Sequence, residues 1–230
     1  MTRLDTKLAR ILAGQYRPDD FIIADAKDPD MGPSIVSAGP HRGPDGSVLR
    51  NRTRPEFLDQ IRAIVRQDIL DVMLMSASNL EVLSKEGLFR DSSVKPCIRA
   101  NDTTDIWVMR GATYAQKHSR PFRSVSLPAV RPYTDLGLYS VTFNHDLDAD
   151  VRSLEEFAKF RAEAAAADFQ YFLEVFNPNV ATGIDPEILP HYINDCIARC
   201  LAGVTQAHRP RFLKIAYNGP KALEDRKSVV

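Results

Sequence analysis

The sequence predicts an α/β protein, specifically a (β/α)8 TIM barrel that forms one domain over residues 1–230. Segments with the pattern of a buried strand alternate strictly with segments that have a helical apolar period, which is typical of a parallel α/β fold. Polar side chains also recur at every second position of the predicted strands. That face fits the interior of a barrel near its catalytic mouth better than an open sheet covered by helices on both sides.

The first half of the chain alternates helices and strands around one long loop. Thr53 is expected to cap a helix that carries Glu56 in its first turn, because this spacing forms a capping box. The predicted elements are, in order, a helix over 5–15, a strand over 21–26, a loop rich in Pro, Gly and Asp to residue 51, the helix from 53, a strand over 71–76, a helix capped by Ser78 or Asn79, and a strand over 95–100.

The second half continues the alternation. Its clearest helix is the segment over 153–168, which is rich in Ala and Glu, both strong helix formers. The predicted elements are a helix over 106–117, a proline-containing loop, a strand over 138–143, the helix over 153–168, a strand over 171–176, a helix over 186–207 and a strand over 212–217.

A complete eight-stranded barrel would need two further strands after residue 217. Val229 and Val230 could begin a seventh strand, and nothing supplies an eighth. We therefore expect strands 7 and 8 to be missing, so that the chain is a fragment or a partner completes its barrel. Such a chain should be poorly soluble or weakly active by itself, because an open barrel exposes sheet edges.

Composition narrows the range of partners. The 30 basic residues balance the 30 acidic ones, so no overall field favours nucleic acid or an anionic membrane. No apolar run approaches the roughly 20 residues of a membrane helix. Three cysteines, Cys97, Cys196 and Cys200, lack a CxxC spacing, and no apolar signal core opens the chain. The sequence predicts a cytoplasmic protein that binds neither nucleic acid nor membrane.

One parity of the predicted strands carries the candidate site. Four charged residues of this parity are expected to meet near the carboxyl ends of the strands, where barrel enzymes assemble their sites. The alternative is a structural network of ion pairs that does no chemistry. The polar parity comprises Asp25, Lys27, Arg99, Asn101, Ser140, Thr142, Asn144, Glu174 and Lys214.

Lys214 is the candidate nucleophile. It lies among apolar residues in the strand over 212–217, and desolvation there would favour the neutral amine that attacks carbonyl groups. The simpler alternative is a lysine at a strand end whose ammonium group reaches water.

The segment Phe-Leu-Lys-Ile-Ala-Tyr-Asn-Gly-Pro-Lys, residues 212–221, resembles the Schiff-base strand of class I aldolases of the archaeal fructose-bisphosphate aldolase and deoxyribose-phosphate aldolase superfamily. Residues 22–26, Ile-Ile-Ala-Asp-Ala, resemble the first strand of that family, and residues 96–99, Pro-Cys-Ile-Arg, resemble its third strand. The resemblance is tight around Lys214 and looser elsewhere. This sequence differs from the family at Phe143 and Asn144, where the family has a proton-donating tyrosine.

The resemblance implies that Lys214 forms an imine with a ketone or aldehyde. Asp25 would orient or deprotonate the substrate, and Glu174 would exchange protons. Arg99 would hold a substrate oxygen or phosphate, or else pair with a carboxylate. The remaining expected substrate-binding residues are Lys27, Asn101 and Asn144, and the candidates for the general acid are Tyr139, His145 and Tyr217.

The predicted function is an aldolase-type carbon–carbon lyase that acts on a sugar or sugar phosphate and uses neither a cofactor nor a metal. We expect a homo-oligomer. Two alternatives stay open: a barrel isomerase or epimerase in which Lys214 acts only through its charge, and an inactive truncated barrel that serves as an assembly subunit.

Overall fold

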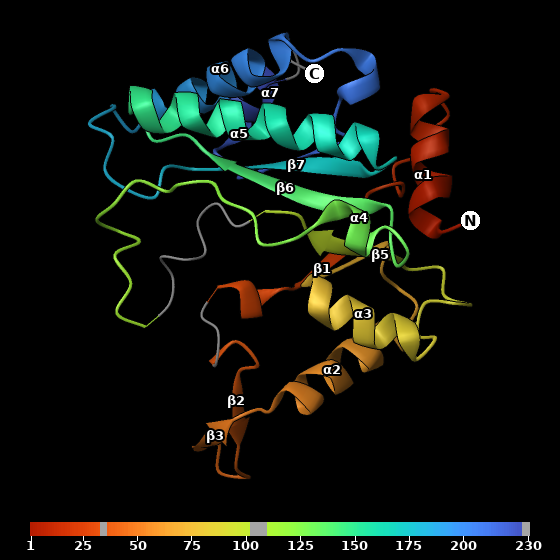
Figure 1. Cartoon of the computed structure of the whole chain (residues 1–230). Helices are drawn as coiled ribbons and strands as arrows, with labels where there is room; N and C mark the ends of the chain where they lie inside the picture. Colours follow the sequence, from red (N-terminus) through yellow and green to blue (C-terminus); the bar gives the residue numbers. More distant parts are fainter. Residues whose placement is uncertain (33–35, 102–109, 227–230) are drawn as a thin grey trace. The chain divides into compact units, whose positions relative to one another are not determined.

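The computed structural model describes residues 1–32, 36–101 and 110–226 (Figure 1). The chain divides into two compact units. Unit 1 comprises residues 1–99 and 129–136, and unit 2 comprises residues 100–128 and 137–230.

Unit 1 contains three parallel strands of the main sheet, with helices and one hairpin. Strand β1 pairs with β4, and β4 pairs with β5. The elements are α1 (Arg3–Leu12), β1 (Ala24–Lys27), the 3-10 turn η1 (Pro29–Met31), β2 (Pro40–Arg42), β3 (Val48–Asn51), α2 (Arg54–Arg66), β4 (Val72–Met75), α3 (Ala77–Lys85) and β5 (Lys95–Arg99).

Two helices of unit 1 begin at or near the residues expected to cap them. Thr53 and Glu56 form the expected capping box at α2, where the backbone N–H of Thr53 donates to Glu56 Oε2 over 2.7 Å. Helix α3 begins less than one turn earlier than expected, with Ser76 as its N-cap instead of Ser78 or Asn79. Ser76 directly follows β4, so the strand and the helix are joined without a loop.

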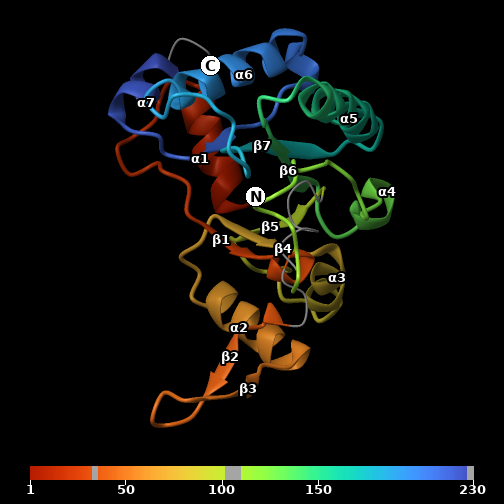
Figure 2. The same ribbon diagram turned by 90° about the vertical axis from the view of Figure 1, so that its left-hand side faces the viewer.

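An antiparallel hairpin occupies part of the segment expected to be a loop. Strands β2 and β3 pair with an irregularity between His41 and Arg42, and the turn contains Gly46 at a φ of 81°. Both strands are short and largely exposed, so no alternation of apolar residues marks them in the sequence. Figure 2 shows the hairpin beside α2.

Unit 2 contains the other three strands of the sheet. Strand β7 pairs with β8 in parallel, with Glu174 opposite Lys214. The remaining elements, the first two of which span the division between the units, are α4 (Leu127–Val130), β6 (Leu136–Thr142), α5 (Leu147–Ala166), β7 (Gln170–Phe176), α6 (Leu189–Ala202), the 3-10 turn η4 (Gln206–His208), β8 (Leu213–Ile215) and α7 (Pro220–Arg226).

Helices α5 and α6 lie over the same side of β6 and β7 (Figure 1). An aromatic cluster fills this layer: the ring of Tyr139 stacks on Phe160 at 4.4 Å between centroids, and Tyr171 meets Phe160 edge-on at 5.1 Å. These rings bury large apolar areas, which is the main stabilising contribution to such a layer. The apolar parity of the strands therefore faces helices in unit 2, as expected.

The expectation of a (β/α)8 TIM barrel is wrong. Within residues 1–32, 36–101 and 110–226 the sheet has the strand order β1-β4-β5-β6-β7-β8, in which β1 and β8 end the order and do not pair. Six strands account for this sheet, so the idea that two strands are missing has no support. Side-chain parity shows which residues share a face, but it does not show whether a sheet closes on itself.

Several predicted elements also differ from the structure. Residues 110–117, the described part of the expected helix over 106–117, form turns. Helix α6 spans a shorter range than the expected 186–207, and helix α7 was not expected. Val229 and Val230, expected to begin a seventh strand, lie outside the described residues. No helix in the described part of the chain has both the length and the apolar character to cross a membrane.

Candidate functional site

The centre of the candidate site is a contact between Lys214 on β8 and Glu174 on β7. The parallel pairing places these residues opposite each other, so their side chains emerge on the same face of the sheet. The Lys214 ammonium group donates a short hydrogen bond to Glu174 Oε1. On the neighbouring strand β6, the hydroxyl of Ser140 donates to Glu174 Oε2 over 2.8 Å.

The two partners differ in exposure. The side chain of Glu174 is 6% exposed, whereas that of Lys214 is 51% exposed. The expectation that apolar neighbours desolvate Lys214 is therefore wrong. Strand β8 is only three residues long and ends the sheet order, so the apolar residues beside Lys214 do not enclose its side chain. The carboxylate is the buried member of the pair, and the amine is open to solvent.

Asn101 supports the position of Ser140. The side-chain amide of Asn101 donates to the carbonyl oxygen of Ser140 over 2.8 Å, and its oxygen accepts from the Ser140 N–H over 2.7 Å. This reciprocal pair fixes the backbone of β6 at the residue that contacts Glu174. Asn101 thus holds the strand that carries the site, and its expected role in substrate binding stays a prediction.

Buried polar groups at and just beyond the end of β6 have no hydrogen-bond partner in the described part of the chain. The hydroxyl of Thr142 and both polar side-chain atoms of Asn144 are buried without a hydrogen bond among the described residues. A buried amide or hydroxyl without a partner is costly, and an amide can satisfy donors and acceptors alike. A ligand with hydroxyl groups would supply both. Thr142 shares the face of Ser140, because successive side chains alternate along a strand.

In unit 1 the structure places Asp25 and Lys27 together on β1. Lys27 Nζ lies 2.9 Å from Asp25 Oδ1, and both side chains are about one-quarter exposed. Arg99, at the end of β5, pairs with Asp28 through a short contact between its Nε and the carboxylate. Of the two roles that the resemblance left open for Arg99, the structure contains the pairing with a carboxylate.

Asp30 is a group that sequence reasoning missed as part of a site. Its Oδ2 accepts hydrogen bonds from Ser76 Oγ at 2.5 Å and from Asn79 Nδ2 at 3.1 Å, while its Oδ1 is buried without a described partner. Burial raises the pKa of the Asp30 carboxyl above its usual value, and the hydrogen bond from Ser76 only partly offsets this. The signal in the sequence that could have identified Asp30 is the acidic run that directly follows the first strand.

The predicted site residues fall into both units. Asp25, Lys27 and Arg99 belong to unit 1, whereas Asn101, Asn144, Glu174 and Lys214 belong to unit 2. The structure brings together Asp25 with Lys27 and Glu174 with Lys214. The meeting of Asp25, Arg99, Glu174 and Lys214 at one point stays a prediction.

The three candidates for a general acid have different surroundings. Tyr139 packs on α5 against Phe160, on the opposite face of β6 from Ser140, and burial raises the pKa of its phenol. His145 has a φ of 59°, and its Nδ1 lies 3.3 Å from the carbonyl oxygen of Thr182. Tyr217 is 72% exposed. Tyr139 is thus on the wrong face to serve Lys214.

Comparisons with known proteins add no assignment to these residues. No family model matches the chain, and no curated protein matches it. One solved structure that is similar to it is Cgl0159 from Corynebacterium glutamicum (Brevibacterium flavum), with 16% sequence identity, a TM-score of 0.48, and coverage of 100% of this chain and 97% of that chain. In the described ranges, no cluster of three or more His, Cys, Asp or Glu side chains is placed to hold a metal ion.

Proposed function

We propose that the chain is an imine-forming carbon–carbon lyase that acts on a sugar or sugar phosphate. The observation that carries the proposal is the pairing of a solvent-accessible lysine amine with a buried carboxylate across adjacent strands. An imine-forming lysine must be reachable by a carbonyl compound, and it needs a neighbouring group that exchanges protons with it.

The proposed chemistry begins with proton transfer from the Lys214 ammonium group to the Glu174 carboxylate. The neutral amine then attacks the substrate carbonyl carbon and forms a carbinolamine. Glu174 returns its proton to the carbinolamine hydroxyl, which leaves as water and gives an iminium. The iminium accepts the electron pair of the neighbouring carbon–carbon bond as Glu174, again a carboxylate, takes a hydroxyl proton from the substrate, and an aldehyde departs. Glu174 then returns this proton to the enamine carbon, and hydrolysis of the resulting iminium releases the second carbonyl product and regenerates the amine.

The unpartnered polar groups at the end of β6 support a hydroxylated substrate. Thr142 and Asn144 together offer a hydroxyl, an amide N–H and an amide oxygen. A sugar carries hydroxyl groups at several positions and could pair with all three. The resemblance of residues 212–221 to an aldolase strand supports the same choice of reaction.

Location and assembly are part of the proposal. We assign the protein to the cytoplasm because Cys97, Cys196 and Cys200 are unpaired thiols, which suits a reducing compartment.

We further propose that it forms a homo-oligomer whose ligand is a small sugar molecule. Sedimentation velocity over a range of protein concentrations tests the assembly, and a concentration-independent monomer would contradict it.

Trapping of the imine tests the proposed reaction. The protein is mixed with dihydroxyacetone phosphate, reduced with sodium borohydride and measured as an intact mass. Wild type should gain the mass of one reduced adduct, and Lys214→Met should gain none. Lys221→Met is the matched control, because Lys221 is an exposed lysine of the same segment and its loss should leave trapping unchanged.

Two outcomes would overturn the proposal. The first is an adduct of equal yield in Lys214→Met. The second is the lack of any adduct with dihydroxyacetone phosphate, dihydroxyacetone and glyceraldehyde 3-phosphate, under conditions that trap a known class I aldolase. Isomerisation of a sugar phosphate without a trapped adduct would instead favour an enzyme in which Lys214 acts only through its charge.

A further inference from the structure

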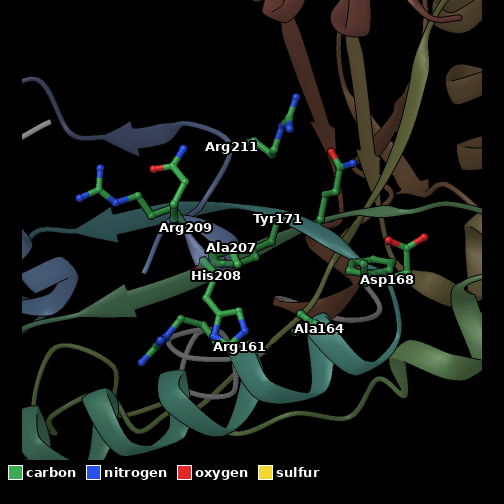
Figure 3. A pocket seen from close by; sticks show the side chains of 12 residues that line it. Arg161, Ala164, Asp168, Tyr171, Ala207, His208, Arg209 and Arg211 are labelled. Atoms are coloured by element: carbon green, nitrogen blue, oxygen red, sulfur yellow. The ribbon is translucent and has the colours of Figure 1, made fainter. Parts of the chain in front are cut away.

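A cavity of about 400 Å³ in unit 2 lies at the start of β7. It is lined by one side of α5, by the start of β7 and by the segment that precedes β8. Figure 3 shows Arg161 and Ala164 on α5, and His208, Arg209 and Arg211 on that segment. The proposed lyase chemistry uses none of these residues.

The cavity is rich in cationic groups. Arg161, Arg209, Arg211 and His208 line it, and Asp168 is its one lining carboxylate. Within the part of the chain that the structure describes, none of the three arginines forms an ion pair. By contrast Arg62, on α2, contacts two carboxylates at 2.7 Å.

Arg161 is the most constrained of these cations. Its guanidinium group lies over the ring of Phe157, with 5.0 Å between its central carbon and the ring centroid. Its Nε is buried and has no hydrogen-bond acceptor among the described residues. A buried N–H of a charged group that lacks an acceptor is costly, so an anionic oxygen in the cavity would remove that cost.

Hydrogen bonds fix the position of the segment that precedes β8, which lines another side of the cavity. The hydroxyl of Tyr171 donates to the carbonyl oxygen of His208 over 2.7 Å, and the N–H of Arg211 donates to the carbonyl oxygen of Tyr171 over 2.8 Å. Both bonds tie the segment before β8 to β7. Arg209 and Arg211 are exposed, and Arg211 extends away from Arg161 in Figure 3. Their long side chains can turn toward an anion without moving the backbone.

The cavity and the Lys214 pair lie on different faces of the sheet. Tyr171 lines the cavity and packs against Phe160 of α5, whereas Glu174 has the opposite parity on β7. A ligand in the cavity would therefore not contact the Lys214 amine. The two sites can be tested independently.

We propose that this cavity binds a small phosphorylated molecule, with the phosphate held by Arg161, His208 and Arg209. A planar guanidinium group matches the geometry of phosphate oxygens and can donate two hydrogen bonds to them. The volume lies within the range of small-molecule sites. The ligand is a site-bound effector or second substrate that is distinct from the compound that reacts at Lys214.

Isothermal titration with inorganic phosphate and glycerol 3-phosphate, with glycerol as the uncharged comparison, tests this site. Wild type should bind both phosphates saturably and should not bind glycerol. Arg161→Gln and Arg209→Gln should each weaken binding by about tenfold, as expected for the loss of a charge-assisted hydrogen bond. Arg209 is on an exposed segment, so its variant should fold even if loss of the contact with Phe157 impairs Arg161→Gln.

Arg199→Gln is the matched control, because Arg199 is an exposed arginine of α6 that does not line the cavity. Its binding should equal that of wild type. The proposal is overturned if wild type does not bind phosphate at millimolar concentration, or if Arg209→Gln and folded Arg161→Gln bind as tightly as Arg199→Gln. The proposal is also overturned if wild type binds a single-stranded oligonucleotide more tightly than glycerol 3-phosphate and the same variants lose that binding. The cavity would then be a nucleic-acid site.

Discussion

At the scale of single residues, the contact between Lys214 and Glu174 stabilises the carboxylate more than it stabilises the amine. The Lys214 amine can be hydrated because half of its side chain is exposed, whereas the Glu174 carboxylate is buried and depends on protein donors. Loss of the lysine should therefore cost more stability than loss of the carboxylate, because it leaves a buried charge with fewer partners.

A double-mutant cycle measures this dependence. Lys214→Met should lower the free energy of unfolding by about 1–3 kcal/mol, because a buried charged group loses a strong hydrogen bond. Addition of Glu174→Gln should recover part of the loss, since it removes the charge and keeps an acceptor for Ser140. Urea denaturation gives both values, and a double variant less stable than Lys214→Met would contradict the expected coupling.

Asp30 should make stability fall as pH rises through the acid range. Its pKa is raised in the folded protein, so the folded state holds this proton more tightly than the unfolded chain does. The resulting stabilisation is complete below the unfolded pKa and is lost as pH rises through the folded pKa. Asp30→Asn removes the titration, so its stability relative to wild type should increase between about pH 3 and pH 7.

Urea denaturation of wild type and Asp30→Asn at several pH values provides that comparison. The two proteins share all other titrating groups, so the difference between them isolates Asp30. A difference that moves in the opposite direction with pH would show that the Asp30 pKa is lowered, and the burial argument would then be wrong.

At the scale of elements, Gly137 allows β6 to pack closely against its neighbours. A Cβ at this position would lie 2.7 Å from Cε1 of Phe169 and 3.2 Å from the Cβ of Ala100. Phe169 is itself 5% exposed, so its ring has little room to move. The requirement is for space, because Gly137 does not have a positive φ.

Gly137→Ala should destabilise the protein by about 1–3 kcal/mol through overpacking. Gly203→Ala is the control, because a Cβ there meets no atom within 4 Å and its φ of −92° suits any residue. Thermal unfolding of both variants makes the comparison. Equal melting temperatures would contradict this prediction, because they would show that the ring of Phe169 moves to admit the added methyl group without loss of stability.

The accuracy of sequence reasoning about elements depended on burial. The helix capped by Thr53 and the apolar strand β4 were predicted well, because a capping box and a buried strand both leave local patterns. The β2–β3 hairpin was missed because its exposed strands have no apolar alternation. The expected helix over 106–117 failed in its described part because apolar spacing alone does not require a helix.

At the scale of the whole molecule, closure of the sheet could not be read from the sequence. Strict alternation predicted the parallel α/β class, and side-chain parity correctly placed Ser140, Glu174 and Lys214 on one face. Neither pattern contains information on whether the first and last strands pair. The exposure of Lys214 was missed for a related reason, because the wrong choice of a barrel placed β8 in an enclosed interior.

The proposed reaction requires the imine to form on Lys214. Trypsin normally cleaves after Lys214, so a reduced adduct on this residue should protect the bond and yield the intact peptide 212–221 with the added mass of the reduced adduct, which is the ligand mass less one oxygen atom. Peptide mapping by mass spectrometry of wild type trapped with dihydroxyacetone phosphate is the most direct measurement. We predict that the adduct lies on Lys214 within peptide 212–221. Its location on another lysine, with Lys214 unmodified, would contradict the account.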